Sequence, residues 1–172
     1  MRLRLPPVLL AAVAALAGCS PATPAEPPAG TSSADQPAAT AGPAPSCASV
    51  SAAVIKASLN IAVSEPTQTT NGSTITCNYL PADGAHTVVI MFRTGEDTDS
   101  FARGRRSLDT AGQPTSDVSG VADEAYVSST EFGDTVTNSL VARKGSVTMS
   151  VAAVAPVDAE KNLVTKVLGG AG

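Results

Sequence analysis

Proline is concentrated in one part of this chain, and that concentration limits how the rest can fold. Of 13 prolines, seven lie between Ser20 and Ser46, at positions 21, 24, 27, 28, 37, 43 and 45. The same segment is rich in Ala, Thr, Ser and Gly and contains no large apolar residue. Such a sequence cannot bury enough surface to offset the entropy lost on ordering. We therefore expect residues 19–46 to form a disordered, partly extended tether.

A short apolar run precedes this tether. Arg2 and Arg4 are followed by ten apolar residues, Val8–Ala17. A membrane-spanning helix needs about 20 apolar residues, so this run is too short to serve as one. A basic start followed by an apolar stretch of this length is typical of a secretory signal peptide, which we assign to residues 1–18.

The apolar run ends in Leu16, Ala17, Gly18 and Cys19. These residues resemble the bacterial lipobox, in which a branched apolar residue and two small residues precede a cysteine. The resemblance implies cleavage between Gly18 and Cys19 and attachment of a diacylglycerol, with palmitate-type chains, to the Cys19 thiol. Two acyl chains on one residue meet the requirement for stable anchoring. The lipoprotein would then lie on the extracytoplasmic face of the cell membrane. The alternative is a plain signal peptide cut nearby, which leaves Cys19 free or paired.

The remainder, residues 47–172, carries the periodic patterns of a folded domain. Apolar residues at helical spacing predict a helix over 47–60. Helices are also predicted over 96–108 and 156–168, because acidic residues lie near their starts and residues typical of helix ends follow. Strands are predicted over 61–65, 73–80, 86–93, 124–132, 135–144 and 146–154, and residues 66–72 are predicted to form a loop. This order predicts an α+β fold, in which an antiparallel sheet of about six strands forms two meanders packed by two to three helices on one side.

The other two cysteines lie inside this domain. Cys47 opens the first helical segment and Cys77 lies between Ile75 and Tyr79, on the inward face of a strand. An exported chain meets an oxidising compartment, so we predict a Cys47–Cys77 disulfide. Two buried free thiols are the alternative. Two cysteines, a single histidine and no CxxC spacing do not suit a metal site, and no cofactor is expected.

The charge balance narrows the classes of partner. The whole chain has a formal net charge of −4, and without Arg2 and Arg4 it has 9 basic against 15 acidic residues, or −6. A mildly acidic chain gives no reason to expect a nucleic acid as a partner.

One cluster of basic side chains consists of Arg93, Arg103, Arg105 and Arg106. We interpret it as a solvated helix end facing nearby acids rather than as a site for anionic polymers.

No arrangement of residues predicts catalysis. His86 is the only histidine, and no GxSxG motif accompanies it. Asp123 and Glu124 are adjacent, and adjacent residues on a strand point to opposite faces, so we do not expect their carboxylates to converge. The acids Glu96, Asp97 and Asp99 lack the spacing of a calcium loop and are expected to stabilise a helix N-terminus.

Several segments together resemble a known group. Cys47 is followed by TCNY (76–79), GVADEAYV (120–127), VARKGSVTMSV (141–151) and AEKNLVTKVL (159–168). This succession is similar to a domain-of-unknown-function group of envelope lipoproteins in high-GC Gram-positive bacteria. The chain departs from the group's pattern at Val121 and Ala122, where an apolar residue and glycine are usual. The resemblance implies a location and a fold but no reaction.

We therefore expect a non-enzymatic domain that binds an unknown small molecule or is accessory to a membrane complex. The alternative is a protein-interaction module that regulates an envelope enzyme.

Overall fold

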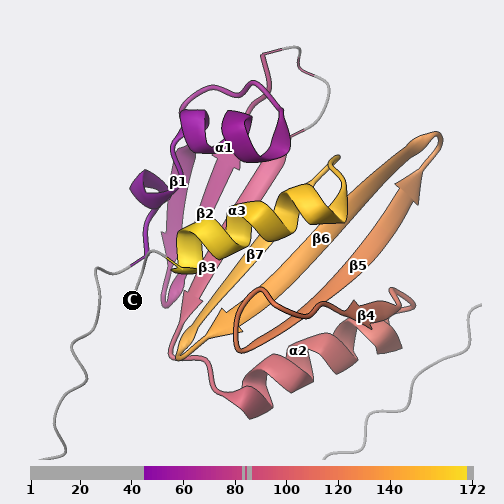
Figure 1. Ribbon diagram of the computed structural model, residues 1–172. Helices are drawn as coiled ribbons and strands as arrows, with labels where there is room; N and C mark the ends of the chain where they lie inside the picture. Colours follow the sequence, from indigo (N-terminus) through magenta and orange to yellow (C-terminus); the bar gives the residue numbers. More distant parts are fainter. Residues whose placement is uncertain (1–44, 83, 85–86, 170–172) are drawn as a thin grey trace, which may run out of the picture. The chain divides into compact units, whose positions relative to one another are not determined.

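The computed structural model describes residues 45–82, 84 and 87–169, and these residues form one antiparallel sheet with three α-helices (Figure 1). The sheet has seven strands in the order β1-β2-β3-β7-β6-β5-β4. The α+β prediction is confirmed. The expected signal peptide, including Gly18, the expected lipidation site Cys19 and nearly all of the expected tether lie outside the described residues.

The predicted helix over 47–60 consists of two pieces. A 3-10 turn, η1, spans Cys47–Ser49, and the α-helix α1 spans Ala52–Leu59. Ser51 separates them because its backbone is extended, with ψ at 161°, and its hydroxyl accepts a hydrogen bond from the Val54 N–H. Ser51 is thus the N-cap that starts α1. Asn60 ends the helix in the left-handed conformation.

The first meander comprises β1 (Thr67–Asn71), β2 (Thr74–Tyr79) and β3 (Val88–Thr94). The strand predicted over 61–65 is wrong, since this segment forms only an isolated bridge between Val63 and Pro81. The segment predicted as a loop contains β1 instead. All five β1 residues are exposed and polar, so the strand lacks the apolar alternation that would identify it.

The second half begins with α2 (Thr98–Thr110) and the short strand β4 (Thr115–Asp117), which the sequence analysis did not predict. It continues with the strands β5 (Glu124–Phe132), β6 (Thr135–Lys144) and β7 (Val147–Ala153) and ends with α3 (Val157–Gly169). The strands β4 to β7 form a second meander, and the pairing of β3 with β7 joins it to the first.

One face of the sheet carries the main core. Paired residues across β3, β7 and β6 bury Ile90, Val151 and Leu140 in one row and Phe92, Met149 and Ala142 in the next. The helices α1 and α3 contact each other, and α3 lies against β6 and β7 on this face (Figure 1). A chain without tryptophan therefore builds its core from aliphatic side chains together with Phe92 and Tyr79.

The helix α2 packs on the opposite face, so the prediction that the helices cover one side is wrong for α2. Ala125 belongs to the main core, and the next residue, Tyr126, points to the other face. There the Tyr126 ring meets Phe101 of α2, with 5.1 Å between ring centroids. Gly104 of α2 also lies against Tyr126, and a Cβ at that position would make an ordinary van der Waals contact with the hydroxyl at 3.7 Å.

Candidate functional site

The predicted disulfide is present and fastens the start of the domain to the sheet. Cys47 of η1 is bonded to Cys77 of β2, with a Cα–Cα distance of 5.6 Å. The neighbouring Tyr79 donates a buried hydrogen bond to the Val50 carbonyl. Burial, and to a smaller extent the charge of Glu65, raises the pKa of Tyr79 to about 12, so its hydroxyl stays protonated at neutral pH. The disulfide and the Tyr79 hydrogen bond are both buried, so we expect them to stabilise the fold.

A pocket of about 360 Å³ lies between α2, β4 and the start of β5. Its wall is mainly apolar with a few charged groups at the rim, and it is lined by Phe101, Ala102, Arg105, Asp117, Val118, Ser119, Glu124 and Ala125. Small-molecule sites have volumes of roughly 300–1,000 Å³ and combine apolar walls with few polar groups. The pocket is open and sits at the lower end of that range. It can accept a small apolar group next to a charged one.

Arg105 supplies the cationic part of the rim. Its Nε donates to the Thr115 hydroxyl at 2.9 Å, and one terminal nitrogen pairs with Asp117. The guanidinium carbon also lies 5.8 Å from the centre of the Tyr126 ring. These contacts tie α2 to β4 and β5 and hold the arginine in place. For Arg105 alone, the pair with Asp117 agrees with the interpretation that the arginine cluster faces neighbouring acids.

The rim's acidic part belongs to a small ion-pair network. Glu124 accepts from Arg143 Nε at 3.2 Å, and Asp123 lies 4.0 Å from the same guanidinium. The two carboxylates thus contact different nitrogens of one guanidinium, Asp123 at the longer distance. Asp123 precedes β5, so strand alternation does not govern its direction. Arg143 also donates to Thr98 at 3.2 Å, which links the start of α2 to β6.

Asp97, directly before α2, acts as predicted. Asp97 is the N-cap of α2, and its carboxylate accepts from the Ser100 N–H at 2.7 Å. Hydrogen bonds from the Ser100 side chain and backbone lower the pKa of Asp97. Among the described residues, no group of three or more His, Cys, Asp or Glu side chains could hold a metal ion. His86 lies outside the described residues.

One buried carboxyl group was not predicted from the sequence. Glu160 of α3 is fully buried, and neither side-chain oxygen has a hydrogen-bond partner of acceptable geometry. Burial raises the pKa of Glu160 to about 8, although the nearby backbone groups of Ala153 and Leu140 act in the opposite direction. At neutral pH the side chain is therefore mostly protonated. Its spacing from Leu163 and Val164 places it on the apolar stripe of α3, a signal that was available in the sequence.

Comparison with known proteins adds no relative. No protein-family model, no curated protein and no solved structure matches this chain. Across the described part of the chain, no helix combines the length and the apolar character required to span a bilayer.

Proposed function

We propose that this chain is a lipid-anchored envelope lipoprotein whose folded domain is a non-catalytic ligand-binding module. The anchor is supported by the residues Leu16 to Cys19 at the end of an apolar run of signal-peptide length. Ligand binding is supported by the pocket between α2, β4 and β5, which is the observation that carries this part of the proposal.

The anchor is tested by replacing its thiol. We expect Cys19→Ser to remain unprocessed or to be released into the medium, because a serine hydroxyl cannot form the thioether that carries the lipid. The control Ser20→Ala changes the next residue and keeps the thiol. Membrane fractionation and the mass of the mature protein are the measurements. A Cys19→Ser protein that stays on the membrane at the mature mass would contradict the anchor.

The pocket is expected to hold a small molecule with an apolar part and a polar group that meets Arg105, Asp117 or Glu124. Native mass spectrometry of the mature protein, purified from its own membranes, measures what remains bound. We expect Ala102→Phe to fill the pocket and to abolish the bound mass. Ala53→Phe, at an exposed position on α1, should keep it. A bound mass that survives Ala102→Phe, or no bound mass in the natural protein, would refute this use of the pocket.

Protein interaction is the second candidate function. The observation that favours it is Phe132, whose side chain is exposed at the end of the β5–β6 hairpin. A regulator or inhibitor of an envelope enzyme would need such a contact surface, and the same lipid anchor would hold it near membrane partners.

A further inference from the structure

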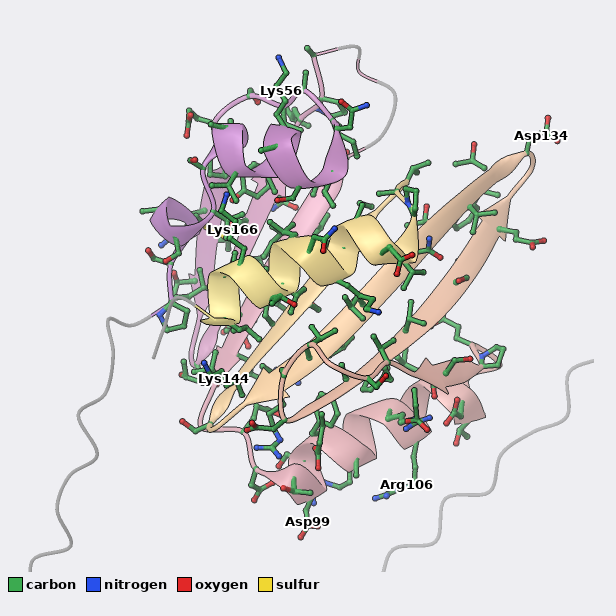
Figure 2. All side chains as sticks on the ribbon, viewed as in Figure 1. Lys56, Asp99, Arg106, Asp134, Lys144 and Lys166 are labelled. Carbon is green, nitrogen blue, oxygen red and sulfur yellow. A yellow bond between two sulfur atoms is a disulfide. The ribbon has the colours of Figure 1, made fainter. Side chains whose placement is uncertain are left out.

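The β5–β6 hairpin extends beyond the rest of the sheet. β7 pairs with β6 only from Asn138 onward, and β4 pairs with β5 only as far as Ser128. The residues in between, 129–137, pair only within the hairpin, between β5 and β6. We call this segment the hairpin arm. Figure 1 shows it projecting past the neighbouring strands, and Figure 2 shows Asp134 at its tip.

The arm exposes apolar side chains that the rest of the domain does not cover. Phe132 is 70% exposed and Val136 is 43% exposed. The chain has only five Phe and Tyr residues, and the other four, Tyr79, Phe92, Phe101 and Tyr126, are buried. Exposed aromatic side chains are enriched at the centres of protein interfaces. The backbone of Phe132 is paired with Thr135, so the strand holds the ring in its exposed position.

The charges on the arm indicate which surface it fits. Glu131 and Asp134 are its only charged residues, and both are acidic. Two acids disfavour contact with anionic lipid headgroups. They also disfavour contact between two arms, because a second copy would bring like charges together. Glu131 and Phe132 point to opposite faces of the hairpin, so an apolar pocket that encloses the tip, with basic residues on both sides of it, satisfies the aromatic ring and both carboxylates.

We propose that the hairpin arm docks into an apolar pocket rimmed by Lys or Arg on another protein, with Phe132 as the anchor and Glu131 and Asp134 as the rim contacts. This proposal rests on protein interaction as the second candidate function. It is independent of the pocket beside α2 and of the lipid anchor.

Site-specific photo-crosslinking of the full chain in its own cells tests the proposal. A benzophenone-bearing phenylalanine analogue replaces Phe132, and the same analogue at Thr69 of the exposed strand β1 is the control. We expect one protein adduct from position 132 and not from position 69. Mass spectrometry should locate the crosslink in a partner peptide that combines apolar residues with Lys or Arg.

Charge reversal separates the stated partner chemistry from interaction in general. We expect the double variant Glu131→Lys/Asp134→Lys to reduce the adduct at least about tenfold, since like charges at an interface rim slow association. The matched control Asp99→Lys/Asp158→Lys changes the net charge equally on α2 and α3 and should leave the adduct unchanged. An adduct that persists after charge reversal on the arm would show that the partner has no basic rim, but it would still support protein interaction. Adducts only with lipid or with a second copy, or no adduct, overturn the docking proposal.

Discussion

The two faces of the sheet are built differently. On the face covered by α1 and α3, the buried side chains form one continuous apolar cluster that includes Cys77 and the disulfide. On the opposite face, α2 covers one end through Phe101 and Arg105, and Phe101 and Tyr126 are buried outside the main cluster. The partly exposed Thr74, Thr76, Asn78, Ser139 and Ser150 lie on the remainder of this face.

This difference separates the stable core from the proposed binding site. Apolar burial is the main stabilising contribution, and it is concentrated on the α1–α3 face. The α2 face holds the pocket, and its helix is attached by a few aromatic and charged contacts. Segments with few buried apolar contacts open locally at lower free energy than the core does, and binding regions are drawn from such segments.

The sharpest comparison uses two neighbouring residues on β3. Phe92 points into the α1–α3 face and is 1% exposed, whereas Met91 lies on the other face and is partly exposed. We expect Phe92→Ala to lower the free energy of unfolding by about 4 kcal/mol, because it leaves a cavity in the core. Met91→Ala should cost about 1 kcal/mol or less. Denaturant unfolding measures both, and equal losses would contradict the division between faces.

The disulfide should contribute nearly as much as Phe92. A crosslink between residues 30 positions apart reduces the entropy of the unfolded chain, which corresponds to about 3–4 kcal/mol. We expect the double variant Cys47→Ala/Cys77→Ala to lose this amount of unfolding free energy. The natural protein measured with and without reductant serves as the comparison. A reductant that leaves the unfolding midpoint unchanged would show that the bond is absent or has no effect.

Glu160 makes the stability of the α1–α3 face depend on pH. Its folded pKa of about 8 exceeds the ordinary value of 4.5, so the folded state binds more protons than the unfolded state between these pH values. The contribution of Glu160 to the free energy of unfolding should therefore be greatest below about pH 4.5 and should fall as the pH rises to 8. Between pH 5 and 7 we expect a loss of about 2–3 kcal/mol.

The variant Glu160→Gln isolates this contribution because its amide does not titrate. Its unfolding free energy should lack the decline between pH 5 and 7 that the natural protein shows. Asp158→Asn, at an exposed carboxyl in the same helix, is the control and should retain the decline. Parallel pH profiles for the natural protein and Glu160→Gln would mean that Glu160 does not carry the effect.

The smallest effect is expected on the arm. Phe132→Ser removes an aromatic ring that is already 70% exposed, so the unfolding free energy should change by no more than about 0.5 kcal/mol. Thermal unfolding measures it. A large loss of stability would show that Phe132 is part of the fold, and its exposure would then not mark a docking surface.

Sequence patterns could predict the elements that carry apolar periodicity or turn signals. The long strands β5 and β6, the turn at Gly133 and the disulfide all follow from such patterns. β1 could not be predicted in this way, because its exposed polar residues form a strand only through pairing with β2. Tertiary pairing overrides local preference in such edge strands.

The pocket was beyond sequence reasoning for a related reason. Arg105 and Glu124 are 19 positions apart, and only the packing of α2 against β4 and β5 places them on one rim. The convergence of Asp123 and Glu124 on Arg143 likewise depends on the β5–β6 register. Adjacent residues alone do not show where their side chains meet.

Native-state hydrogen exchange tests the division between the two faces most directly. The amides of α1, α3, β3 and β7 should exchange only through global unfolding, whereas those of α2 should exchange through local opening at a lower free energy. Phe101→Ala should further lower the free energy of local opening of α2 and leave the protection of β3 and β7 nearly unchanged. Equal free energies of exchange for α2 and the α1–α3 face would contradict the separation of the stable core from the proposed binding site.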